Sequence, residues 1–306
     1  MSALRSPYTY FGGKATVAHE IWARFGQVYN YVEPFFGSGS VLLSRPHSPQ
    51  HEIVNDLDCN IVNFWRSVRK SPDILHSLVD HPISEIDFNT RKKVLRREQK
   101  NLRKFLESDP DHCDVKLAGY WVWCVNLAIG GTPSLLTRLR TKPVAQGHGL
   151  LGRTQDKLTW LQQLHNRLTN VRVYCGQWDR VLTDAVLWPS THPELPVGVY
   201  LDPPYDHDAV CRELYVEHKD SVAAGAREWA IRHGSNPSLR IALSCYNNVS
   251  MPDGWTMYRW STRGGFANLT GSENLNRNET RNREVIWFSP HCLVPTQPTQ
   301  LALGVH

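Results

Sequence analysis

The chain has 306 residues, enough for one large domain or for one domain that carries an insertion. Its composition is ordinary for a soluble globular protein, and we expect a cytoplasmic protein because neither a membrane-length apolar run nor a signal-peptide core is present. The seven cysteines form no C-x-x-C pair, which predicts free thiols rather than disulfides or a zinc site, and the net charge of +5 permits a polyanionic partner.

Short apolar strands alternate with helices in both the first and the last third of the chain. Helices are expected at 58–68 and from Pro72 onward, where Ser71 and Pro72 form a start signal. This alternation predicts βα units around a mostly parallel sheet. The expected strands are 28–34, 51–55, 171–175, 197–201, 239–244, 255–260 and 284–288.

The character of the sequence changes at about Ser84, where a basic helical block interrupts the α/β pattern. A helix over 91–105 carries most of the basic residues, and a second one over 111–129 is aromatic and buried. We therefore expect one α/β domain in two pieces, 1–83 and 170–292, with an inserted, mainly helical domain between them. The inserted domain covers 84–169, a long loop covers 261–282, and 293–306 form a flexible tail.

A glycine-containing turn, Gly37-Ser-Gly39, follows the first expected strand. It lacks the third glycine of a dinucleotide fingerprint and the Gly-Lys-Ser/Thr of a phosphate loop, so alone it fits a plain tight turn. About twenty residues later Asp56 ends the second strand, where an acid can hold two ribose hydroxyls. Asp58 suits the cap of the next helix. Together, the turn and Asp56 predict a site for a nucleoside cofactor.

The sequence Asp202-Pro-Pro-Tyr205 directly follows the strand expected at 197–201. The two prolines make this turn rigid and leave its carbonyls free to accept hydrogen bonds. An ionised aspartate only accepts, so Asp202 and the Pro203 carbonyl can take both N–H donors of an exocyclic amino group. Tyr205 offers a flat face for a base, worth about 1–3 kcal/mol. The alternative is an ordinary Pro-Pro turn, which the position at a strand end disfavours.

These motifs occur in an order that resembles the Dam-like family of DNA adenine-N6 methyltransferases over about 6–83 and 170–290. The resemblance implies a Rossmann-like class I methyltransferase sheet with an inserted target-recognition domain, S-adenosylmethionine as cofactor, and N6 of a flipped-out adenine in double-stranded DNA as acceptor. The matching segments are Tyr10-Phe-Gly-Gly-Lys14, Val32-Glu-Pro-Phe-Phe-Gly-Ser-Gly39, Asn55-Asp56 and Asp202-Pro-Pro-Tyr205.

The resemblance also implies which residues form the site. Gln177 stands where the family usually has an acid, and Asp179 is the nearby substitute. The implied catalytic residues are Asp202, Pro203, Pro204 and Tyr205. The implied cofactor-binding residues are Tyr10, Gly12, Gly13, Lys14, Glu33, Pro34, Phe35, Phe36, Gly37, Ser38, Gly39, Asp56, Leu57, Gln177, Trp178 and Asp202, with Lys14 near either the cofactor carboxylate or the flipped base.

Contacts with DNA are expected from the insertion and from the late loop, although a solvated charged helix explains the basic helix equally well. The chosen residues are Arg91, Lys92 and Arg96 on that helix, Arg138, Arg140 and Lys142 in the loop that follows, and Arg277.

Several alternatives to DNA adenine stay open. The same chemistry suits adenine in RNA, cytosine N4 or a glutamine amide, and a catalytically silent nucleic-acid-binding relative is a further possibility. No metal is expected, and no Pro-Cys motif supports methylation of a cytosine ring carbon. Without a nuclease-like motif, we expect a monomeric or weakly dimeric stand-alone methylase, paired with a separate restriction endonuclease or carried by a phage.

Overall fold

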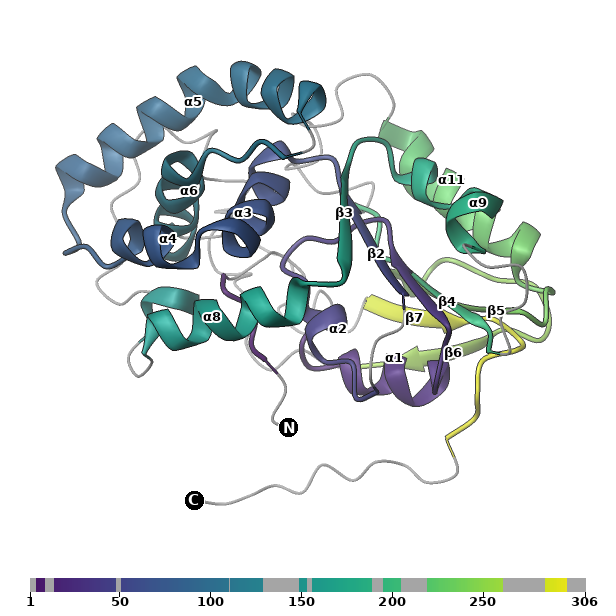
Figure 1. Cartoon of the computed structure of the whole chain (residues 1–306). Coiled ribbons are helices and arrows are strands. Elements are labelled where there is room, and N and C mark those ends of the chain that lie inside the picture. The colour runs from purple at the N-terminus through teal and green to yellow at the C-terminus, as the bar shows by residue number, and fades with distance from the viewer. Residues whose placement is uncertain are drawn as a thin grey trace, which may run out of the picture.

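A computed structural model of the chain describes residues 4–8, 14–47, 51–109, 111–128, 149–152, 156–188, 195–204, 219–260 and 284–295. These residues form a seven-stranded sheet in the order β3-β2-β1-β4-β5-β7-β6, flanked by helices (Figure 1). The strands are β1 (Asn30–Glu33), β2 (His51–Asp56), β3 (Val171–Cys175), β4 (Val197–Leu201), β5 (Leu239–Tyr246), β6 (Thr256–Arg259) and β7 (Glu284–Phe288).

The five neighbouring strands β1 to β5 are parallel, β7 runs in the opposite direction, and β6 beyond it runs in the same direction as the first five. In the centre of the sheet Val32 of β1 is level with Ile53 of β2 and with Val199 of β4. β3 and β5 extend this parallel block, whereas β7 runs antiparallel to both β5 and β6. The carboxyl ends of β1 to β5 therefore emerge at one edge, where ligands of open α/β sheets bind. This arrangement confirms the expected Rossmann-like α/β fold.

Alternate residues of the central strands enter two different cores. On β1, Tyr31 packs with α1 (Ala18–Phe25), α2 (Ser40–Leu43) and α3 (Cys59–Lys70), whereas Val32 packs on the other face with α9 (Asp184–Leu187) and α11 (Lys219–His233). Both faces are covered, so β1 and β4 are buried along their whole length.

The helical part of the chain extends the first of these cores away from the sheet. Three of its helices begin at side-chain caps, because Ser84, Asp114 and Asp156 each accept a hydrogen bond from a backbone N–H three residues later. Trp121 contacts Phe64 of α3, so the two parts share one core. A domain boundary at residue 84 stays a prediction. The helices are α4 (Pro72–Val79), α5 (Glu85–Ser108), α6 (Val115–Leu127) and α8 (Lys157–Leu168).

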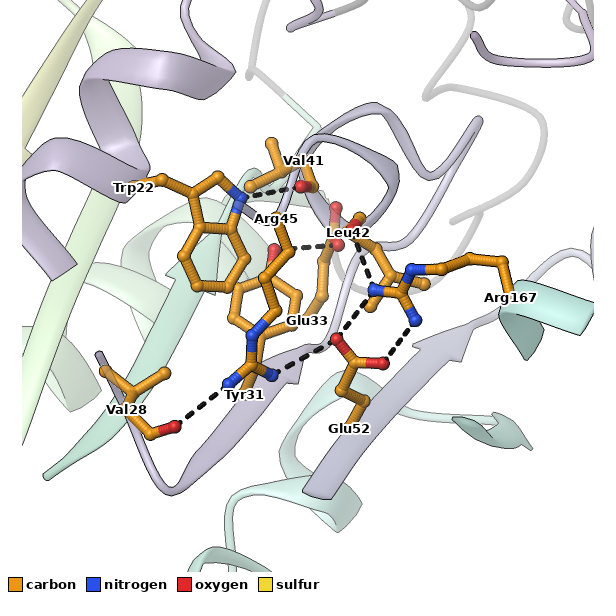
Figure 2. Close-up of polar contacts among 9 residues, drawn as sticks. All are labelled: Trp22, Val28, Tyr31, Glu33, Val41, Leu42, Arg45, Glu52 and Arg167. Carbon is orange, nitrogen blue, oxygen red and sulfur yellow. Dashed lines mark hydrogen bonds and ion pairs between the residues drawn. The ribbon is translucent and has the colours of Figure 1, made fainter. Parts of the chain in front are cut away.

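A buried cluster of charges fixes the last of these helices to the sheet (Figure 2). The Glu52 carboxylate of β2 lies 3.1 Å from Arg45 and receives two hydrogen bonds of 2.5 and 2.7 Å from Arg167 of α8. Arg167 also donates to the Leu42 carbonyl at 3.0 Å, and Arg45 donates to the Val28 carbonyl at 2.9 Å. Since Glu52 is fully buried, its charge depends on both arginines.

Within the described ranges, no helix is long and apolar enough to cross a membrane. The described cysteines are free thiols, as the sequence predicts.

Candidate active site

The turn after β1 is built on two glycines with a left-handed backbone, Gly37 at φ 49° and Gly39 at φ 69°. A side chain at Gly39 would also collide with Phe36, whose ring carbon would lie 2.8 Å from the added Cβ. The buried Tyr8 hydroxyl donates to the Gly37 carbonyl at 2.6 Å. Both glycines are therefore required by the shape of this turn. The sequence of the turn alone fitted a plain tight turn.

Asp56 holds the same turn from the end of β2. One carboxylate oxygen accepts from the Gly37 N–H at 2.8 Å and the other from the Asp58 N–H at 2.9 Å. Burial raises the pKa of Asp56 to about 7, although these backbone hydrogen bonds lower it. Each oxygen retains a lone pair, so the expected binding of ribose hydroxyls is compatible with this geometry and stays a prediction. The expected cap of α3 by Asp58 is confirmed.

Asn55 is a structural residue of the site to which the sequence reasoning gave no role. Its side-chain amide donates at 3.0 Å to the Pro34 carbonyl and at 3.0 Å to the Gly176 carbonyl. Its own backbone carbonyl accepts from the Phe36 N–H at 2.9 Å. One buried side chain thereby joins the carboxyl ends of β1, β2 and β3. The signal that could have identified it is an amide side chain at the end of a buried strand.

The segment after β3 contributes an aromatic surface. Trp178 stacks on Phe35 with ring centroids 5.9 Å apart and planes 22° from parallel. Gln177 and Asp179 on either side of Trp178 are exposed. The structure thus brings the predicted Phe35 and Trp178 together at the sheet edge, while Gln177 faces solvent.

Asp202 follows the last residue of β4 and forms an ion pair with Lys14. The Lys14 Nζ atom lies 3.1 Å from Asp202 Oδ2 and 3.6 Å from Glu284 Oε2, and it lies 5.9 Å from the centre of the Trp260 ring. Lys14 is 4% exposed, whereas the two carboxylates are 22% and 21% exposed. Lys14 is therefore at the Asp202 end of the site. Its expected location near either the cofactor carboxylate or the flipped base stays a prediction.

The charges of this group support one another. Burial opposes a charge on Lys14, but Asp202 and Glu284 outweigh it and raise the pKa of the Lys14 ammonium. Nearby, burial raises the pKa of Glu33 well above its ordinary value, and the Tyr31 hydroxyl donates to Glu33 at 2.8 Å. The carboxyl edge of the sheet thus combines one stabilised cation with several carboxyl groups.

Two basic residues expected to face DNA are instead buried within the helical part. The Arg91 guanidinium lies 4.2 Å from the Trp123 ring centre and 4.8 Å from that of Tyr120, and Lys92 lies over Phe88. Burial lowers the pKa of both side chains. This position argues against phosphate contacts, because both side chains pack against aromatic rings of α5 and α6.

The rest of the basic helix faces outward. Arg96 is exposed, as are Lys93, Lys100 and Lys104, which share its face at helical spacing. Arg103 turns toward the sheet and donates to the Leu57 carbonyl at 2.6 Å, so it ties α5 to the segment after Asp56. We retain the exposed residues as candidates for phosphate contacts.

Some expected site residues lie outside the described residues. They are Tyr10, Gly12, Gly13, Tyr205, Arg138, Arg140, Lys142 and Arg277. Among the residues that the structure does describe, no group of histidine, cysteine, aspartate and glutamate side chains is arranged to hold a metal ion.

Comparison with known proteins finds similarity to a family model, to a phage protein and to solved structures. The family model of the D12 class N6 adenine-specific DNA methyltransferases matches residues 10–222. A DNA N-6-adenine-methyltransferase of Escherichia phage P1 is 28% identical over 91 residues, which are 30% of this chain and 12% of that protein. The structure of the rRNA methyltransferase aviRa from Streptomyces viridochromogenes is 17% identical in sequence and has a TM-score of 0.37. The match covers 94% of this chain and 90% of that protein.

The family model spans more than half of the chain and includes the glycine turn, Asp56 and the Asp202 turn. The chain therefore belongs to the D12 class N6 adenine-specific DNA methyltransferase family.

Proposed function

We propose that the protein transfers a methyl group from S-adenosylmethionine to N6 of an adenine that is flipped out of double-stranded DNA. The observation that carries this proposal is the position of Asp202. It directly follows β4 at the same sheet edge as the glycine turn, it is paired with Lys14 at 3.1 Å, and two prolines follow it. Membership of the family supplies the acceptor class.

The chemistry of the residues at this edge fits S-adenosylmethionine. Asp56 offers acceptors for ribose hydroxyls, and Phe35 with Trp178 offers an aromatic surface for the adenine. The cofactor carries a sulfonium and an ammonium group, and Glu33 and Asp202 supply carboxyl groups on that side. When bound, S-adenosylmethionine supplies an electrophilic methyl group.

Asp202 acts on the acceptor in this proposal. Its carboxylate and the Pro203 carbonyl accept the two hydrogens of the amino group, which orients the nitrogen lone pair. Positive charge would grow on that nitrogen as its bond to the methyl carbon forms and the bond from that carbon to sulfur breaks, so a fixed carboxylate stabilises the transition state more than the ground state. The methylated nitrogen would then release one of its two protons to solvent through the partly exposed Asp202 carboxylate. The remaining contribution is alignment in a site from which water is excluded. Neither a covalent enzyme intermediate nor a metal enters these steps.

DNA would contact the exposed basic face of α5. Lys93, Arg96, Lys100 and Lys104 recur every three or four residues, so they form one row along a helix of 24 residues, about 36 Å long. Such a row suits contacts with phosphates, which fix position without reading sequence. Flipping the adenine costs a few kcal/mol, which stacking and the hydrogen bonds to Asp202 offset. The target-recognition role of 84–169 belongs to the same proposal.

The test is to incubate the protein with unmethylated DNA and methyl-labelled cofactor and to map the modified bases. We expect N6-methyladenine, with a loss of at least about 10²–10³-fold in rate for Asp202→Asn and retained cofactor binding by calorimetry. Asp253→Asn, an exposed aspartate in another loop, is the matched control. Wild-type activity in Asp202→Asn contradicts the catalytic role.

Other outcomes identify the alternatives. Modification of cytosine N4 or of RNA adenine would replace the acceptor and keep the chemistry. A wild-type protein that binds DNA but not the cofactor would be the silent relative. A separate restriction endonuclease and a monomeric or weakly dimeric state stay predictions from the sequence.

A further inference from the structure

Glu284 is brought to the site by the reversal of β7. It is the first residue of that strand and pairs in register with Tyr246, the last residue of β5. Because β7 runs antiparallel to β5, its first residue lies at the edge where the parallel strands end. Glu284 thereby reaches the Lys14–Asp202 pair, although 81 residues separate it from Asp202 in the sequence (284 − 202 − 1).

Lys14 lies between two carboxylates, and the second one changes the net charge of the group. Lys14 and Asp202 alone would be neutral, so the acceptor would face a pair with no net charge. With Glu284, whose carboxylate is 3.6 Å from Lys14 Nζ, the three residues carry one net negative charge. A group that must stabilise positive charge on the acceptor nitrogen benefits from this excess.

The same contact controls how Lys14 holds Asp202. Lys14 is almost completely buried, and burial favours its uncharged form. A neutral amine would no longer form an ion pair with Asp202 Oδ2. Two carboxylates keep the proton on the amine more firmly than one does.

We propose that Glu284 is a positioning residue, which holds Lys14 in its charged form against Asp202 and gives the three-residue group a net negative charge. This inference rests on the proposed function of Asp202. Glu284 acts through Lys14 and needs no contact with the substrate.

The test is Glu284→Gln in the full-length protein, with Glu228→Gln on the exposed side of α11 as the matched control. For Glu284→Gln we expect kcat to fall about 10–100-fold, with less than about threefold change in KM for DNA. Glu284→Asp should recover part of the loss, because it keeps the charge. Should Glu284→Gln not fold, Glu284→Asp alone carries the test through its lower kcat.

A second readout is independent of catalysis. The ¹³Cε resonance of Lys14, assigned by its loss in Lys14→Arg, should titrate at a lower pH in Glu284→Gln than in the wild-type protein. The sign follows because one of the two carboxylates that raise the Lys14 pKa is gone while burial is unchanged. The alkaline limb of the kcat profile should shift in the same direction.

The substitution Glu284→Gln leaves the other described groups around Lys14 unchanged. Asp202 and the Trp260 ring face Lys14, and Tyr200 and Glu33 lie near Asp202. Unchanged kcat and an unchanged Lys14 titration in Glu284→Gln would overturn the inference. A wild-type protein that methylates no amino group would instead overturn the proposed function, and the Lys14 titration would still report on Glu284.

Discussion

The carboxyl edge of the sheet and the basic helix α5 are both rich in charge, but they use it in different ways. At the sheet edge Asp56 and Lys14 are each held by at least two partners, so every charge has a defined neighbour. On α5, Arg91 and Lys92 are buried while their neighbour Lys93 is exposed. Basic residues that are adjacent in the sequence therefore differ in role when they lie on different faces of the helix.

This contrast teaches that a motif at a strand end and a charge run on a helix carry unequal information. A strand end has one location relative to its sheet, whereas a helix can turn any face toward its partner. On α5, the buried face includes Arg91, because its guanidinium packs against the Trp123 and Tyr120 rings of α6.

The largest expected effect tests whether the sheet and the helical part of the chain unfold together. Arg167→Met removes one of the two arginines that balance the buried Glu52 carboxylate and should lower the free energy of unfolding by about 3–5 kcal/mol. Urea unfolding followed by tryptophan fluorescence measures this. Arg172→Met, an exposed arginine on β3, should change stability by less than about 0.5 kcal/mol. If two separate unfolding transitions were seen and only one of them shifted in Arg167→Met, the sheet and the helical part would not share one core.

A smaller effect separates the inner and outer faces of α5. Arg91→Ala should lower stability by about 1–3 kcal/mol, because it removes a buried contact with Trp123 and a hydrogen bond to the Leu78 carbonyl. Lys93→Ala should leave stability nearly unchanged and reduce the salt dependence of DNA binding by about one phosphate contact. The measurements are thermal unfolding and binding titrations at several salt concentrations. If both variants behaved alike, the assignment of faces would be wrong.

A pH dependence is expected at the sheet edge. The folded pKa of Asp56 is about 7, above its ordinary 3.8, so the folded protein binds more protons than the unfolded chain between these values. Asp56 therefore contributes a loss of stability as pH rises from about 4 to 7. If the ionised form binds the ribose, cofactor affinity should rise by at most about tenfold per pH unit below pH 7.

Calorimetry in buffers of different ionisation enthalpy checks this behaviour. Proton release on cofactor binding near pH 7 should diminish in Asp56→Asn, and Asp179→Asn is the exposed control. Undiminished proton release in Asp56→Asn would assign it to another group, such as Glu33.

The sequence predicted the seven strands and the helices that begin at Asp58 and Pro72, because buried strands and capped helices have local signals. It did not predict α1 or α11. The buried face of α11 is made of alanines such as Ala226 and Ala230, which give little apolar contrast, whereas Ile21, Trp22 and Phe25 of α1 do have helical spacing. α5 begins earlier than expected because Ser84 caps it.

The residues of the site likewise divide into those with a local sequence signal and those without one. The glycine turn, Asp56 and Asp202 lie within short motifs, so the sequence identified them together. Glu284 lies in no such motif, and its approach to Lys14 depends on the reversed direction of β7. The burial of Arg91 depends on α6, which no pattern within α5 contains.

The cluster around Glu52 also has a consequence for the order in which the chain leaves the ribosome. Glu52 and Arg167 are 115 positions apart, so at usual rates of translation the carboxylate waits on the order of ten seconds for its second arginine. The neighbour of β1 on the other side, β4, is made later still. A nascent chain that stops within the helical part therefore lacks the partners that close the first half of the sheet, and chaperones would meet it with β1 and β2 still uncovered.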